Sequence, residues 1–244
     1  MSNPIFKIEE RQAEQDRVLD YDKVMTVNGT LQVAAFMGLI LVFAAGFVWT
    51  KFAAGHTDMA VMLTSVGGIV GFISALIIIF ARATALVPLY AACEGLLLGG
   101  LSATFEASYP GIVAQATAGT FAALFSMLIL YRAGIIRCTD KFRSVIFIST
   151  ASIAVIYIVD FIGRLFNYQV PIINTATNGG IIFSIIVVAI AALNLIIDFD
   201  FIEKGAERMY PKKYEWYGAF GLMVTLVWLY VEILNLLAKI SSRD

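Results

Sequence analysis

The sequence predicts an all-α integral membrane protein with seven transmembrane helices, and two observations lead to this prediction. Apolar residues make up 60% of the 244 residues and charged residues only 14%, against about 45–50% and about 25% in soluble domains. Mean hydropathy is +0.84. Such a composition cannot cover a water-facing surface, so it excludes a soluble enzyme and a disordered chain. The net charge of −1 also argues against a nucleic-acid-binding protein.

Seven stretches are long and apolar enough to cross the bilayer, which needs about 20 residues of helix. Their apolar runs are continuous and do not alternate with period two, which argues against a β-barrel. The expected spans are residues 30–50, 59–81, 83–104, 111–131, 144–162, 179–199 and 217–238. We therefore expect a membrane domain over 30–240 and a short tail over 241–244.

Residues 1–29 are polar and form the expected cytoplasmic segment, with no cleavable signal peptide. Within it, the spacing of apolar residues over 8–24 fits a short amphipathic helix, and a solvated tail fits equally well. Of the 17 lysines and arginines, thirteen lie in this segment or in the connections after the second, fourth and sixth spans. Because positive residues concentrate on the cytoplasmic side, the N-terminus is expected in the cytoplasm and the C-terminus on the opposite side.

Ionisable residues inside a span are rare and are functional candidates. Four acids lie within or at the ends of the expected spans: Glu94, Asp160, Asp198 and Glu232. Asp200 lies just beyond the end of the sixth span and is, with Asp160, a secondary candidate. Asp160 precedes Arg164 by four residues, which predicts a local helical ion pair. Glu94 lies about 14 Å into its span, so we expect it to be protonated, paired or facing water. Glu232 has no basic residue within a turn and needs a partner on another helix or a proton.

No enzyme motif occurs in the chain. The HExxH, GxSxG, GxGxxG and P-loop patterns are absent, and two cysteines with one histidine argue against a disulfide framework or a Cys/His metal site. An intramembrane aspartyl protease is the one catalytic alternative, because two acids could share a site, but the Tyr-Asp and Gly-Leu-Gly-Asp sequences expected of such proteases are missing. We expect no enzymatic activity and no cofactor. Small residues over 65–71 and 95–102 predict close helix packing.

Two regions carry a resemblance to a known family. The first comprises residues 94–102 (Glu-Gly-Leu-Leu-Leu-Gly-Gly-Leu-Ser) and 114–121, and the second comprises residues 194–203 (Asn-Leu-Ile-Ile-Asp-Phe-Asp-Phe-Ile-Glu), 215–222 and 228–237. They resemble the transmembrane Bax inhibitor motif family, in its bacterial Bax inhibitor-1-like branch. The resemblance implies two three-helix layers around a central C-terminal helix, in a bacterial inner membrane. It also implies a calcium leak that is regulated by pH.

The resemblance assigns the two acids of the family's pH sensor to Asp198 and Glu232, with calcium as their metal, and their partnering arginine to Arg82. Glu232 stands where many members carry Asp. Helix depths create a tension, because flush helices leave the two acids about 10 Å apart, and Glu94 is the alternative partner of Glu232. The leading hypothesis is a cation channel or exchanger gated by a buried acid pair. The alternative is a non-conducting membrane protein that regulates a protease or another membrane complex.

The topology gives a first testable prediction. Reporter fusions to the two ends of the chain should report opposite sides of the membrane, because seven spans separate them and the basic residues fix the direction. If both fusions report the same side, the count of seven crossings is contradicted, together with the depth assigned to every acid.

Overall fold

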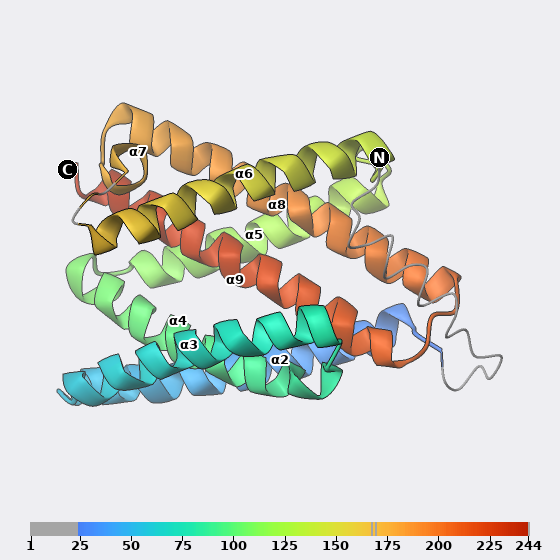
Figure 1. Ribbon diagram of the computed structural model, residues 1–244, viewed down its shortest axis with the longest axis horizontal. Helices are drawn as coiled ribbons and strands as arrows, with labels where there is room; N and C mark the ends of the chain where they lie inside the picture. The colour runs from blue at the N-terminus through green and yellow to red at the C-terminus, as the bar shows by residue number, and fades with distance from the viewer. Residues whose placement is uncertain (1–23, 167, 169, 244) are drawn as a thin grey trace. The chain divides into compact units, whose positions relative to one another are not determined.

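The computed structural model describes residues 24–166, 168 and 170–243. Within these ranges seven helices are long and apolar enough to cross a membrane (Figure 1), which confirms the all-α membrane fold and the number of spans. They are α2 (Val27–Ala53), α3 (Thr57–Ala81), α4 (Val87–Ser108) with the preceding 3-10 turn η2 (Thr84–Leu86), α5 (Ile112–Arg132), α6 (Asp140–Leu165), α8 (Asn178–Glu207) and α9 (Lys213–Ser241). A one-turn helix, α7 (Pro171–Asn174), precedes α8. The amphipathic helix expected over 8–24 falls, apart from its last residue, outside the described residues.

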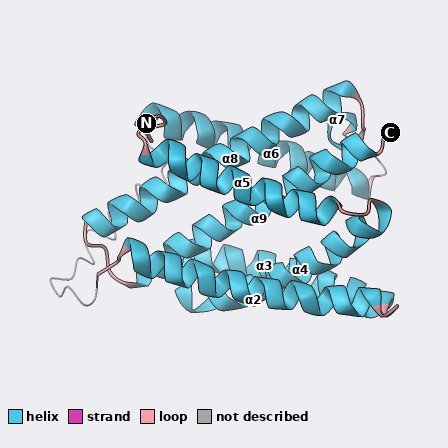
Figure 2. Cartoon of the chain, turned by 180° about the vertical axis from the view of Figure 1, so that it is seen from behind, coloured by secondary structure: helices cyan, strands magenta, loops and turns pink. Residues whose placement is uncertain are grey.

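Short loops connect the helices (Figure 2). The largest difference from the expected boundaries is the end of α8, and α9 also begins earlier than expected. Helix α8 continues to Glu207, eight residues beyond the expected end, and α9 begins at Lys213, four residues earlier than expected. The added turns carry charged residues such as Glu203 and Lys204. Hydropathy ends a span at such residues, whereas glutamate and lysine are good helix formers, so the helices extend beyond their apolar parts.

The chain divides into two compact units. Of the described residues, unit 1 contains those within 111–200 and 225–243, and unit 2 contains 24–110 and 201–224. Helices α8 and α9 therefore each contribute residues to both units. The layered arrangement implied by the family resemblance remains a prediction.

In unit 2, α4 packs against both α2 and α3 (Figure 1). Glycines make this close approach possible. A Cβ on Gly95 or Gly99 of α4 would lie only 2.4 Å from Leu41 O or 2.5 Å from Ala45 O, both on the α2 backbone. A Cβ on Gly67 of α3 would lie 2.6 Å from the Cys93 carbonyl oxygen. The predicted close packing through small residues is confirmed here.

The first residues of α2 are fastened to the start of α9 within unit 2. Thr26 is the N-cap of α2, and its backbone N and its Oγ1 each donate to Glu215 Oε1 at 3.0 Å. Glu215 is buried, and Gly29 leaves room for it, because a Cβ there would lie 2.0 Å from Glu215 Oε1. A carboxylate at a helix N-terminus is also favoured by the helix dipole.

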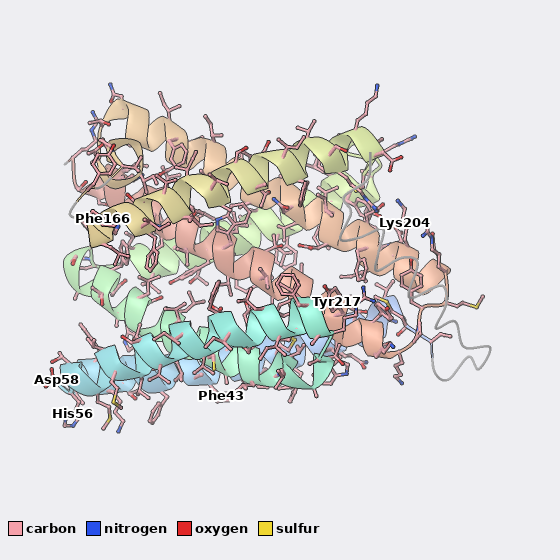
Figure 3. The ribbon with its side chains drawn as sticks, viewed as in Figure 1. Phe43, His56, Asp58, Phe166, Lys204 and Tyr217 are labelled. Atoms are coloured by element: carbon pink, nitrogen blue, oxygen red, sulfur yellow. The ribbon has the colours of Figure 1, made fainter. Side chains whose placement is uncertain are left out.

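Unit 1 combines α5, α6, the first part of α8 and the last part of α9. Asn194 of α8 donates from Nδ2 to Thr150 Oγ1 of α6 at 2.9 Å, and Gly119 of α5 faces Ile233 of α9. In both units large apolar side chains remain exposed on the outer helix faces, as for Phe43 of α2, which is 76% exposed (Figure 3). Such surfaces suit contact with lipid rather than water.

The glycine contacts give a second prediction. Gly99→Ala should lower the melting temperature in detergent micelles by about 3–10 °C, because overpacking against a helix backbone costs about 1–3 kcal/mol. Gly46→Ala is the matched control, since Gly46 lies in α2 with nothing within 4 Å of a built Cβ; its melting temperature should stay unchanged or rise slightly. Equal effects of the two substitutions would contradict the packing described for α2 and α4.

Candidate functional site

Asp198 belongs to α8, and only part of the hydrogen-bonding capacity of its carboxylate is used. Thr225 of α9 donates a hydrogen bond to it. Its Oδ2 atom is buried, and no donor among the described residues reaches that oxygen. Buried polar atoms almost always have a hydrogen-bond partner, so this oxygen marks Asp198 as the strongest site candidate in unit 1.

Asp198 therefore faces Thr225 and not Glu232. Asp198 lies nine residues before the end of α8, and Thr225 lies twelve residues after the start of α9, so the two meet at similar depths of an antiparallel pair. Glu232 lies seven residues further along α9, which is about 10 Å of helix rise. No hydrogen bond between Asp198 and Glu232 occurs in the described part of the chain. The expected contact between these two acids is not formed, because Thr225 and not Glu232 lies at the level of Asp198.

Glu232 has its own partners. It is buried, and its Oε1 accepts from Tyr157 Oη of α6 at 2.8 Å and from Trp228 Nε1 of the same helix at 3.0 Å. The prediction that Glu232 needs a partner on another helix is confirmed by Tyr157. Two donors on one oxygen stabilise a negative charge at this position.

Other oxygen atoms lie near the Asp198 level of α8. Asn194 precedes Asp198 by four residues and therefore lies on the same face of the helix. Both of its amide hydrogens are used, on Thr150 Oγ1 at 2.9 Å and on Ile190 O at 2.8 Å. Its Oδ1 is consequently left as an acceptor on the face of α8 that also carries Asp198.

Asp200, a secondary candidate from the sequence, belongs to a separate buried ion pair. It is 5% exposed and accepts from the guanidinium of Arg143, which is 7% exposed. Arg143 also donates from Nε to Cys138 Sγ at 3.2 Å. A charge pair of this kind stabilises the packing of α6 against α8 only while both partners are present, so a structural role explains Asp200.

Asp160 forms the expected local pair. Its Oδ2 accepts from Arg164 Nε at 2.9 Å, which confirms the i,i+4 prediction. Its Oδ1 accepts from the backbone N of Val170 at 2.8 Å. The carboxylate thus ties the end of α6 to the connection before α7, and this role is structural.

Unit 2 holds the two remaining candidates. Glu94 is half-buried and hydrogen-bonds with Tyr90, one turn earlier on α4, so it is paired as one of the expected alternatives. Arg82 ends α3 in the left-handed conformation with φ 54°, a strained geometry for a residue with a Cβ, and its Nη1 donates to Tyr214 Oη at 3.5 Å. Arg82 and Asp198 belong to different units, so their pairing remains a prediction.

A dense metal centre is not found in the described residues. No group of three or more His, Cys, Asp or Glu side chains there could hold a metal ion. His56 is exposed in the connection between α2 and α3, close to Asp58 (Figure 3). A cation at Asp198 or Glu232 would therefore rely on hydroxyl and amide oxygens in addition to a single carboxylate.

Four residues escaped the sequence reasoning. Thr225, Tyr157 and Trp228 are ordinary in apolar helices, and only the packing of the helices shows that they donate to the two acids. Arg143 was counted among the loop cations, although Thr139 and Asp140 are a typical helix start. That cap places Arg143 inside the first turn of α6, where it can reach a neighbouring helix.

The family model described as Bax inhibitor 1 like matches residues 3–242, nearly the whole chain. Among proteins with curated descriptions, no sequence matches the chain significantly.

The Arg143–Asp200 pair gives a third prediction. Asp200→Asn should lower the melting temperature in micelles by about 6–20 °C, because a buried guanidinium that loses its partner costs about 3–5 kcal/mol. Arg143→Met combined with Asp200→Leu should recover most of this loss. Arg137→Gln is the control for an exposed arginine, since Arg137 donates to the Gly134 carbonyl oxygen in a loop, and it should cost less than about 1 kcal/mol. A stable Asp200→Asn variant would show that the pair does not support the fold.

Proposed function

Because the chain belongs to the Bax inhibitor 1-like family of membrane proteins, we propose that it is a pH-sensitive leak pathway for cations, of the channel or exchanger type, with calcium as the transported ion. In this proposal Asp198 exchanges a proton for a cation. The chain is a multi-pass membrane protein with seven spans, so the activity lies within or across the bilayer.

The buried Oδ2 of Asp198 is the observation that carries the proposal. Inside a membrane protein an ionised carboxylate needs a compensating partner, because the low dielectric makes an isolated charge very costly. Thr225 supplies one neutral hydrogen bond, which compensates only part of that cost. A proton or a metal cation on Oδ2 would supply the rest, and the two would compete for the same oxygen.

The neighbouring atoms favour a hard cation. The Asp198 carboxylate, the Thr225 hydroxyl and the Asn194 amide oxygen are all oxygen ligands, which suit calcium or magnesium better than softer metals. With one carboxylate among them, binding would be weak and the cation would keep part of its water. Weak binding suits transit, since an ion must leave the site as readily as it enters.

Competition between proton and cation fixes the direction of the pH response. At low pH the proton occupies Asp198 and the cation is excluded, whereas at higher pH the carboxylate is available. Calcium flux through this site should therefore increase as pH rises. Glu232, the other acid of unit 1 in this proposal, accepts hydrogen bonds from two donors, Tyr157 and Trp228, so its charge is better compensated than that of Asp198.

Calcium flux into proteoliposomes provides the fourth prediction. Flux through the parent protein should rise several-fold between about pH 5 and about pH 8, and Asp198→Asn should remove this dependence, because an amide cannot exchange a proton. Asp58→Asn is the matched control, since Asp58 is an exposed acid outside unit 1, and it should keep the parent's pH profile.

Two results would overturn the proposal. Absence of calcium flux at every pH in this range would refute the leak pathway and favour the non-conducting alternative, a regulator of another membrane complex. Flux whose pH dependence survives Asp198→Asn would refute the role of Asp198 while leaving the pathway itself in place.

A further inference from the structure

Lys239 lies near the end of α9, and its ammonium group turns inward to α8. Its Nζ donates to Ser184 Oγ at 2.7 Å and to Gly180 O at 3.3 Å, and Ser184 is only 2% exposed. A lysine near the end of a membrane helix ordinarily extends its charge to the headgroup region. Lys239 is instead held within unit 1 by two acceptors of a neighbouring helix.

The surroundings on α8 do not balance this charge. Gly180 and Ser184 lie in the first two turns of α8, which begins at Asn178. The N-terminus of a helix carries a partial positive charge, which repels an ammonium group. A hydroxyl and one backbone carbonyl are neutral acceptors, and the C-terminus of α9, in whose last turn Lys239 lies, supplies only a partial negative charge. A full negative charge for Lys239 must come from a carboxylate.

Glu232 supplies that negative charge without touching the lysine. It precedes Lys239 by seven residues on α9, which places both on the same face of the helix and about 10 Å apart along its axis. Glu232 is the carboxylate that acts electrostatically on Lys239. The Oε1 atom of Glu232 accepts hydrogen bonds from Tyr157 and Trp228. The ammonium group of Lys239 donates its hydrogen bonds to α8. The other acid on a neighbouring helix, Asp160, accepts from Arg164 and from the Val170 backbone.

We propose that Lys239 is a tethered cation that balances Glu232 and thereby limits how tightly unit 1 holds a mobile divalent cation at that carboxylate. The ammonium group takes the electrostatic place of the mobile ion, so it lowers the affinity of Glu232 for that ion. Naming calcium as the mobile ion rests on the proposed function. The balance between Lys239 and Glu232 rests on the geometry of unit 1 alone.

Calcium binding tests the inference directly, with Trp228 as reporter because it donates to Glu232. Three tryptophans occur in the chain, so Trp49→Phe and Trp216→Phe leave Trp228 as the only one. In micelles of this protein, Lys239→Gln should lower the half-saturating calcium concentration at least about tenfold, since it removes a positive charge about 10 Å from the ion. The glutamine amide keeps an uncharged hydrogen-bond donor at this position. Lys239→Arg retains the charge and should behave like the parent.

Two matched variants complete the design. Lys51→Gln removes a lysine from the last turn of α2, where it lies over the Phe47 ring, and should leave the calcium titration unchanged. Ser184→Ala keeps the charge of Lys239 but removes its buried acceptor on α8. The ammonium group can then approach Glu232, and the half-saturating concentration should rise. This variant tests the inference independently if Lys239→Gln does not fold.

The outcomes separate the inference from the proposed function. An unchanged calcium affinity in folded Lys239→Gln overturns the inference, and so does the absence of any Trp228 response to calcium up to about 10 mM in parent and variant. A parent that does not leak calcium but shows the affinity shift refutes the proposed function alone. A calcium leak without the affinity shift refutes the inference alone.

Discussion

In the hydrocarbon core of a bilayer no water is available, so each polar group in a spanning helix must find its partner within the protein. The backbone meets this constraint by forming helices. The charged side chains meet it in several different ways: Arg143 and Asp200 neutralise each other, Glu232 accepts from a tyrosine and a tryptophan, and Lys239 binds a serine and a carbonyl. Asp198 differs from these residues, because its buried Oδ2 has no hydrogen-bond partner among the described residues.

These solutions differ in what they allow the protein to do. A guanidinium–carboxylate pair is complete in itself and resists change, because removing either partner leaves an uncompensated charge. A carboxylate held by neutral donors retains a net charge that can attract a cation or a proton. Asp160 and Asp200 are therefore paired with a guanidinium, whereas the acids of the proposed function, Asp198 and Glu232, accept hydrogen bonds from neutral donors.

Close packing in unit 2 depends on the same absence of water. Lipid tails are as apolar as leucine, so helices gain little from burying apolar side chains against each other and depend on van der Waals contact instead. Gly95 and Gly99 bring the backbone of α4 directly onto α2. Glu215 adds a polar fastening by accepting two hydrogen bonds at the start of α2. Together they connect α2, α4 and the first turns of α9 without any disulfide bond between the described residues.

The sequence by itself determined the seven spans, the family and the glycine faces, because these properties follow from local composition and spacing. It also determined the pair of Asp160 with Arg164, since residues four apart on a helix meet wherever that helix lies. The partner of Asp198 was different. Sequence spacing does not determine the relative depth of α8 and α9. The family resemblance therefore led to Glu232 as the predicted partner of Asp198. Only the tertiary structure decided that Thr225 lies at the level of Asp198 and that Glu232 binds Tyr157 and Trp228. Contacts between helices depend on where each helix begins relative to its neighbour. Hydropathy does not give these positions, because the helices extend beyond their apolar residues.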